Sequence, residues 1–278
     1  MTIDGGRITN GARDITIRNS AFTSHLTING VINSNILLDH NTHLNINATS
    51  GSPPARVHLA YDCGEQHSGV TIRNSLFAYG DADGIQTGCG VNIIGNEFRD
   101  IVQNGPNHTD NIQMVGSTGT VIRGNWVHTT TDATTQGISA YDGVTRAVIE
   151  DNVVDIHRAW GIELYSDDGS IVRHNTLQYY PPGCYGGAPC GLNTLNRKAV
   201  DDAGRNTVVV DNVATEITTA NGSTVAERHD NLVRQNVGSG DLQGTPAFVG
   251  GTGYDAFRLA AGSAGKNAAS DGLDVGIR

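Results

Sequence analysis

The chain has 278 residues, a formal net charge of −10, 36 glycines and 18 basic residues, of which only two are lysine. This charge argues against nucleic acid as a general partner, and a local arginine cluster or a cation would be needed for the chain to bind a polyanion. No run of 18 apolar residues is present, so the sequence predicts no membrane span.

A short phrase recurs nine times along the chain, as Ile-Thr-Ile-Arg-Asn-Ser at residues 15–20 and Val-Thr-Ile-Arg-Asn-Ser at residues 70–75. Its central aliphatic positions are Ile17, Leu38, Ile72, Ile93, Ile122, Ile149, Val172, Val209 and Val233. The local pattern has period two and is broken by Gly and Asn, with no amphipathic helical pattern. Each unit therefore predicts one coil of short strands, and successive coils stack about 4.8 Å apart.

A column of asparagines accompanies the repeat, with serine in two copies. Its members are Ser20, Asn41, Ser75, Asn96, Asn125, Asn152, Asn175, Asn212 and Asn236. Asparagine tolerates the left-handed backbone of a tight bend, and stacked amides bond from coil to coil. We therefore expect these residues at a turn, in a ladder.

The repeat resembles the right-handed parallel β-helix of the pectate-lyase-like superfamily over residues 1–238. The resemblance implies an all-β solenoid of about nine to ten coils and a polysaccharide-active protein. Residues 239–278 are similar to the C-terminal segment of many secreted bacterial β-helix proteins, with glycine-rich stretches at 244–251 and 272–276. An open coil end exposes unpaired strand edges, so we expect this segment to cap the last coil.

A second strand follows each phrase, most clearly at residues 83–88, 110–115, 136–141 and 160–165. Because side chains alternate along a strand, the isoleucines at 85, 112, 138 and 162 should point inward. One outward row is then His58, Gln86, Gln113, Ser139, Glu163 and Asn193. A second outward row is Ala60, Gly88, Val115, Tyr141 and Tyr165. Asp83 and Asp110 would point inward if the strands reached that far, and a turn there is the alternative.

Longer loops at residues 40–55, 99–109, 129–136 and 178–190 fall beside these rows and predict the walls of a groove. The row of amides, an acid and a histidine suits a linear polysaccharide, and Tyr141 and Tyr165 would stack on sugar rings. We expect substrate contacts from His58, Asp81, Gln86, Gln113, Ser139 and Tyr165. An ordinary polar strand face is the alternative.

A polysaccharide lyase is the first functional hypothesis, as the resemblance implies. β-Elimination from a uronate requires a neutralised carboxylate, a base and an acid. The uronate carboxylate would be neutralised by Gln113, by Arg158 or by a calcium ion held by Asp83 and Asp110. The base would be His108 or Arg158, and the acid would be Tyr141. Calcium is the one cofactor suggested, because clustered carboxylates suit it.

A glycoside hydrolase is the second hypothesis. It needs two carboxylates, and Asp110 and Glu163 lie two coils apart, about 9–10 Å by strand spacing. The acidic composition favours this reaction on a neutral glycan. A non-catalytic carbohydrate-binding or adhesin solenoid is the third hypothesis.

Four cysteines bear on the compartment. Cys63 and Cys89 are about one coil apart and would bridge neighbouring coils, whereas Cys184 and Cys190 would close a small loop. Two disulfides favour an exported protein, and free buried thiols are the alternative. The first residues lack a signal peptide and resemble part of a coil, so we expect a leader or further sequence before Met1. We expect a secreted monomer whose partner is its polysaccharide.

Overall fold

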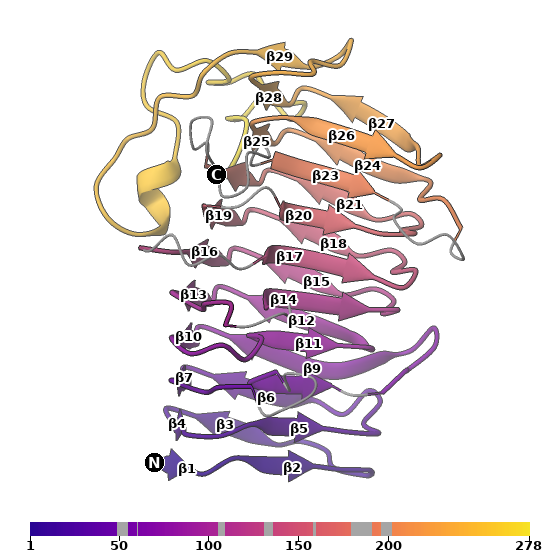
Figure 1. The fold of residues 1–278 in the computed structure, drawn as a ribbon, viewed down its shortest axis with the longest axis vertical. Coiled ribbons are helices and arrows are strands. Elements are labelled where there is room, and N and C mark those ends of the chain that lie inside the picture. Colours follow the sequence, from indigo (N-terminus) through magenta and orange to yellow (C-terminus); the bar gives the residue numbers. More distant parts are fainter. Residues whose placement is uncertain are drawn as a thin grey trace.

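The computed structural model describes residues 1–48, 55–59, 61–104, 109–130, 136–157, 160–178, 191–195 and 202–278. The chain winds as a right-handed parallel β-helix, with three long parallel sheets stacked along its axis (Figure 1). This confirms the predicted fold class. No helix in the described ranges is long and apolar enough to cross a membrane.

Sheet A contains eleven strands and sheets B and C nine each, so the predicted nine to ten coils are confirmed. Sheet A is formed by β1 (Thr2–Ile3), β4 (Ala21–Phe22), β7 (Thr42–Leu44), β10 (Leu76–Ala78), β13 (Glu97–Arg99), β16 (Trp126–His128), β19 (Val153–Asp155), β22 (Thr176–Leu177), β25 (Val213–Ala214), β28 (Leu232–Val233) and β29 (Leu242–Gln243). Sheet B is formed by β2 (Gly6–Ile8), β5 (Leu26–Ile28), β8 (Val57–Leu59), β11 (Ile85–Thr87), β14 (Asp110–Val115), β17 (Gln136–Tyr141), β20 (Trp160–Leu164), β23 (Gly191–Leu195) and β26 (Ile217–Ala220). Sheet C is formed by β3 (Thr16–Arg18), β6 (Ile36–Asp39), β9 (His67–Arg73), β12 (Gly90–Ile94), β15 (Val121–Arg123), β18 (Val148–Glu150), β21 (Ile171–Arg173), β24 (Thr207–Val210) and β27 (Val225–His229).

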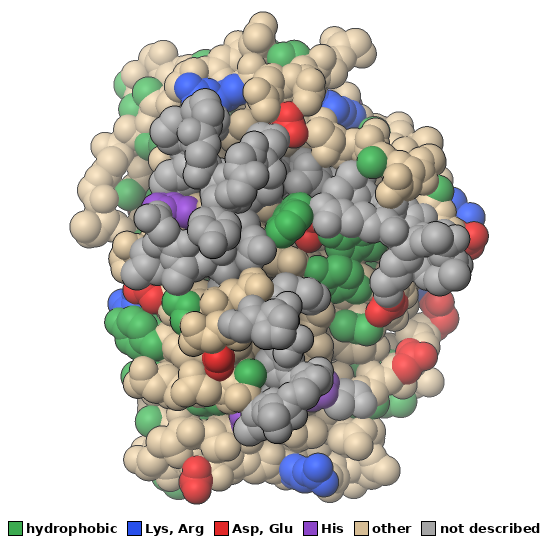
Figure 2. Space-filling model, in the orientation of Figure 1, with side chains coloured by type: hydrophobic (Ala, Val, Ile, Leu, Met, Phe, Trp, Pro, Cys, Tyr) green, Lys and Arg blue, Asp and Glu red, His purple; other side chains and the backbone are tan. Residues whose placement is uncertain are grey.

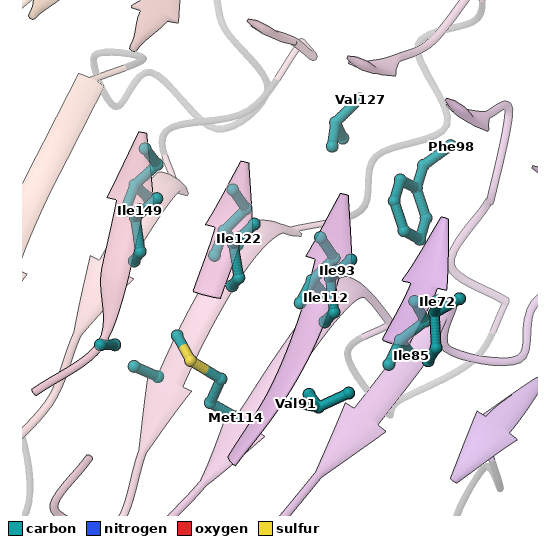
Figure 3. Close-up of a cluster of buried hydrophobic side chains, with 14 of the residues drawn as sticks. Ile72, Ile85, Val91, Ile93, Phe98, Ile112, Met114, Ile122, Val127 and Ile149 are labelled. Carbon is teal, nitrogen blue, oxygen red and sulfur yellow. The ribbon is translucent and has the colours of Figure 1, made fainter. Parts of the chain in front are cut away.

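The core is a stack of aliphatic side chains that repeat from coil to coil. Ile72, Ile93, Ile122 and Ile149 are partners in successive strands of sheet C, and all four are fully buried. Figure 3 shows them beside inward side chains of sheet B, including that of Met114. Complete burial of such a side chain stabilises the fold by about 1.5–3 kcal/mol, so the repeated aliphatic positions hold the coils together.

The ninth copy of the phrase was misaligned. Val233 belongs to β28 in sheet A, and the sheet C partner of Val209 is Arg228 in β27. An arginine at the expected aliphatic position conceals this last strand of sheet C from a search for alternating apolar residues. The last member of the asparagine column is accordingly Asn231, not Asn236.

The asparagine column forms the predicted ladder at the turn from sheet C to sheet A. The backbone N–H of Asn96 donates to Oδ1 of Asn125 at 2.9 Å, and that of Asn125 donates to Asn152 at 3.0 Å. The Asn125 side-chain amide also donates to the carbonyl oxygen of Ile93 at 2.9 Å. The Asn125 side chain thus satisfies two buried backbone groups of the preceding coil.

The left-handed residue is the one before the ladder, which corrects the expected role of the column. His40, Asn74 and Asp151 have φ angles of 53°, 51° and 54°, and each directly precedes a ladder residue. The ladder residues themselves adopt negative φ. Asparagine is therefore used in the column for its amide bonds, and the tight bend is made by its neighbour.

The C-terminal segment folds back along the flank of the coils (Figure 1). The Ser270 hydroxyl donates to Asp211 at 2.6 Å, the Ile277 N–H donates to Thr176 at 3.1 Å, and Arg278 pairs with Asp151 at 2.8 Å. These contacts lie along the side of sheet A, and Leu259, Ala269 and Val275 also pack with Val213 and Leu232 of its last strands. The capping role of residues 239–278 stays a prediction. Stacking also continues beyond residue 238, because β29 pairs with β28.

We predict that Asn125→Ala lowers the free energy of unfolding by about 2–4 kcal/mol, because several buried backbone and amide groups lose their partners. Urea denaturation followed by circular dichroism measures the loss. Asn92→Ala is the matched control, since the Asn92 amide is partly exposed and bonds only to Thr71 Oγ1, at 3.3 Å. Equal midpoints for the two variants would contradict the structural role of the ladder.

His43 lies in an aromatic stack inside the coil. Its ring centroid is 4.5 Å from that of Phe22 and 4.6 Å from that of Phe77, and neither of its buried nitrogens has a hydrogen-bond partner among the described residues. Burial, with a smaller contribution from the Arg56 charge, lowers the His43 pKa from 6.5 to about 3. Because the unfolded chain then binds the proton more tightly, His43 makes stability fall as the pH drops from 6.5 towards 3.

We predict that His43→Phe stabilises the protein and removes this pH dependence, which is at most about 1.4 kcal/mol per pH unit. Melting temperatures at neutral pH and at several acidic pH values test the prediction. His40→Asn is the control, because His40 is exposed and asparagine tolerates its positive φ angle of 53°. An unchanged acid slope in the His43 variant would show that another group causes the dependence.

Candidate functional site

The outward row of sheet B is in register, as the sequence predicts. His58 pairs with Gln86, Gln86 with Gln113, Gln113 with Ser139, and Ser139 with Glu163. The backbone of Asn193 continues the row next to Glu163. His58 and Gln86 are partly exposed, whereas Ser139 and Glu163 are fully buried. The alignment is confirmed, and the substrate-binding role of the row stays a prediction.

The two tyrosines of the second outward row lie next to each other. Tyr141 pairs with Val115, and the Tyr141 and Tyr165 rings stack with centroids 4.8 Å apart. Tyr165 is only 3% exposed, so its ring faces Tyr141 and not a solvent-filled groove. Of the two rings, only the partly exposed Tyr141 is placed to meet a ligand in this arrangement.

The carboxylate of Asp110 faces outward, although simple alternation from the strand would point it into the core. A Cβ built on Gly84 would lie 2.8 Å from the ring of Phe98, so the position before each inward isoleucine also faces the core. Two consecutive side chains therefore face the core, and the residue that precedes them, such as Asp110, faces outward. Asp110 accordingly accepts a hydrogen bond from the outward Ser139 hydroxyl at 2.7 Å.

Asp110, Gln136, Ser139, Tyr141, Glu163 and Tyr165 form what we call the carboxylate–tyrosine cluster. The Tyr141 hydroxyl donates to Gln136 Oε1 at 2.6 Å, and Ser139 Oγ lies 3.1 Å from the same oxygen. On the next coil, the Tyr165 hydroxyl donates to Glu163 Oε1 at 2.8 Å. Hydroxyl donors thus hold the two carboxylates on neighbouring parts of one surface.

Tyr141 lies in the electrostatic field of both carboxylates. Burial first, and then the charges of Asp110 and Glu163, raise the pKa of Tyr141 far above its usual value of 10. The phenol therefore stays protonated at physiological pH and acts as a hydrogen-bond donor. A neutral phenol can orient a sugar hydroxyl, whereas its raised pKa makes it a weaker proton donor to a leaving oxygen.

A cavity of about 500 Å³ opens at the exposed end of the row. It is lined by His58, Leu59, Tyr61, Asp62, Gln86, Gly88, Val115 and Gly116. Burial, and then the nearby charge of His25, lower the pKa of His58, so its imidazole is neutral at pH 7. The Gln86 amide donates to Gln113 Oε1, which links the cavity to the next residue of the row.

Tyr61 lines the cavity and was not predicted from the sequence. The Tyr61 hydroxyl donates to the Val31 carbonyl oxygen at 2.6 Å, which fixes the ring at the edge of the cavity. Cys63 forms the predicted disulfide with Cys89 and ties this wall to the end of β11. The nearby Cys63 could have pointed to Tyr61 in the sequence, because a disulfide fixes the position of the residues beside it. Cys184 and Cys190 lie outside the described residues.

The remaining predicted site residues divide into two groups. His108 and Arg158, the expected bases, lie outside the described residues. Asp81 accepts the backbone N–H of Ala48 at 2.7 Å, so it supports a loop. Asp83 accepts the backbone N–H of Asp110 at 2.9 Å. The second bond occupies one of the carboxylate oxygens proposed for calcium. No group of three or more His, Cys, Asp or Glu side chains suited to a metal is found among the described residues.

Arg56 is a fully buried cation beneath the loop that leads to Asp83. Its guanidinium donates to the carbonyl oxygens of Ala82 and Tyr79. Burial lowers its pKa to about 10, and the charges of Asp83 and Asp81 oppose that shift, so Arg56 stays charged at neutral pH. Arg56 directly precedes the inward Val57 and aligns with Gly84, so it occupies the core-facing position before the strand.

Figure 2 shows the face of the molecule on which sheet B lies, and the described Lys and Arg side chains visible there are near its edges. The described lining of the cavity likewise contains one acid and no Lys or Arg. No protein-family model matches the chain, and no curated protein matches it. The functional argument therefore rests on the fold and on the geometry of this face.

Proposed function

We propose that the protein is a polysaccharide-degrading enzyme that holds a linear glycan along sheet B and cleaves it at the carboxylate–tyrosine cluster. The observation that carries the proposal is the aligned row that leads from the cavity at His58 and Gln86 to Ser139 and Glu163. Stacked coils present polar groups about 4.8 Å apart, which matches the advance of an extended sugar chain by one unit.

The cavity is suited to an uncharged sugar. Neutral His58 and the amide of Gln86 offer donors and acceptors to sugar hydroxyls, and the ring of Tyr61 offers an apolar face. Asp62 would repel a uronate carboxylate, and no described lining residue is a cation that would compensate. We therefore propose a neutral glycan as the substrate class.

Hydrolysis is the reaction that the described residues support best. One carboxylic acid protonates the leaving oxygen while the second carboxylate activates water or attacks the sugar. Asp110 bonds to Ser139, and Ser139 is the register neighbour of Glu163, so one serine separates the two acids. Both acids are fully buried, so a sugar reaches them only after covering atoms move apart.

β-Elimination is the second candidate, with Tyr141 beside the row in the place of its acid. The phenol would supply the proton for the leaving oxygen. Elimination also needs a base and a group that neutralises the uronate, and the residues expected in these roles, His108 and Arg158, are outside the described ranges. The acidic surroundings of Tyr141 oppose a uronate, which places this reaction second.

Export is part of the proposal. The Cys63–Cys89 disulfide is the kind of bond that persists in an oxidising compartment. A polymeric glycan is also too large to be processed inside most cells that consume it. We propose a secreted monomer whose partner is its polysaccharide substrate.

The test is incubation with neutral and uronate-containing polysaccharides, with reducing ends and unsaturated-product absorbance followed in parallel. We expect reducing ends from a neutral glycan without that absorbance. Asp110→Asn and Glu163→Gln should each lower kcat by about 10²-fold or more, because each removes an acid–base group. Glu227→Gln, an exposed acid, is the matched control.

Each other result has a defined meaning. Absorbance from an unsaturated product supports elimination, and glycan binding without cleavage supports a non-catalytic solenoid. Full activity in both cluster variants, with unchanged melting temperatures, would remove the cluster as the catalytic site.

A further inference from the structure

A column of basic side chains runs along the outer face of sheet C. The register aligns Arg18, Asp39, Arg73, Ile94, Arg123, Glu150, Arg173, Val210 and His229. Arginine therefore occupies every second coil over most of the solenoid. This face is distinct from sheet B, which holds the carboxylate–tyrosine cluster.

In the first part of the column, the acid lies beneath its two arginines. Arg18 Nη2 is 2.7 Å from Asp39 Oδ2, and Arg73 Nε is 3.1 Å from Asp39 Oδ1. The Asp39 side chain is 0% exposed, while those of Arg18 and Arg73 are 53% and 41% exposed. Solvent therefore meets the guanidinium groups and not the carboxylate.

The second part of the column repeats this arrangement. Arg173 Nε is 2.6 Å from Glu150 Oε2, and Arg123 pairs with Glu150 Oε1. The Glu150 side chain is 2% exposed, against 50% for Arg123 and 44% for Arg173. Each set of three carries one net positive charge on its outer side, within a protein of net charge −10.

We infer that this arginine column binds a linear anionic polysaccharide that carries a carboxylate or sulfate on every second sugar. Two coils span about 9.6 Å by strand spacing, and an extended sugar chain advances by about one unit per coil. Alternate sugars would then place their acidic groups over Arg18, Arg73, Arg123 and Arg173 in turn. A nucleic acid has a closer phosphate spacing and fits this period less well.

The buried acids prepare the arginines for such a ligand. Arg18 and Arg73 each use Nε and Nη2 to bind Asp39, which fixes the plane of the guanidinium. Both side chains are partly exposed, so an anion binds without first ordering a flexible side chain. Lysine could not be held in this way, since it lacks the planar fork.

The inference does not depend on cleavage at sheet B. The test is calorimetric titration with hyaluronan oligosaccharides, which carry one carboxylate per disaccharide, at low and high salt. We expect binding to the wild-type protein that weakens with salt, and weaker binding of polygalacturonate and of dextran. The double variant R73Q/R123Q should lose about tenfold in affinity, because two charge-assisted contacts are removed.

R73Q/R123Q leaves Asp39 paired with Arg18 and Glu150 paired with Arg173, which protects the fold. The matched control is R146Q/R258Q, which changes the net charge equally at exposed ion pairs away from the column. R73K/R123K keeps the charge without the fork and should bind with intermediate affinity.

Absence of hyaluronan binding to the wild type would overturn the inference, as would equal losses in the two Gln variants. Tighter binding of a DNA oligonucleotide than of hyaluronan would also overturn it in favour of a nucleic-acid surface. Activity at sheet B should be the same in R73Q/R123Q and the wild type. A failure of the column therefore leaves the proposed function intact, and the reverse also holds.

Discussion

The buried asparagine ladder is the interaction on which the remaining geometry depends, because it fixes how one coil sits on the next. Oδ1 of Asn125 accepts from Asn96, and its amide donates to Ile93 and contacts Asn152. A shift of one residue at this turn would leave several buried polar groups without partners, at about 1–3 kcal/mol each. Sheets A and C meet at this turn, so their register is fixed directly. The row on sheet B and the column on sheet C are both consequences of that register.

The strands of sheet B follow loops, and the coils differ from one another in these loops. The turn from sheet C to sheet A is short in every coil, whereas the connections from sheet A to sheet B vary in length. Variation is tolerated there because the parallel backbone bonds of sheet B still align its strands. A solenoid can therefore change the surroundings of the outward row without disturbing its core. Because the core is constant and the loops beside sheet B vary, the sheet B face is favoured as the location of the proposed active site.

The sequence predicts the structural features that repeat from coil to coil, and it does not predict those that depend on a single residue. The coil, the ladder and the row at Gln86 and Gln113 follow from regular spacing around an inward isoleucine. The position of Val233 was wrong because Arg228 replaces an aliphatic residue in the last strand of sheet C. The outward direction of Asp110 depends on a local break in alternation, which no pattern of period two contains. Tyr61 lies in a segment without periodicity, so only the folded chain shows that it lines the cavity. Arg56 stands at the repeat position aligned with Gly84, and an arginine there has no counterpart in the neighbouring coils from which its buried place could be predicted.

Under the two proposals, two faces of one solenoid bind two kinds of polymer. The same coil spacing governs the polar row on sheet B, which includes Glu163, and the arginine column on sheet C. The faces differ in charge because Asp39 and Glu150 are buried beneath arginines, whereas Asp110 and Glu163 face a tyrosine. A protein held by an anionic glycan on one face would act on neutral chains nearby at a high effective concentration. In a cell wall or matrix that contains both polymers, retention on one face would raise the rate of cleavage on the other without any new contact at the active site.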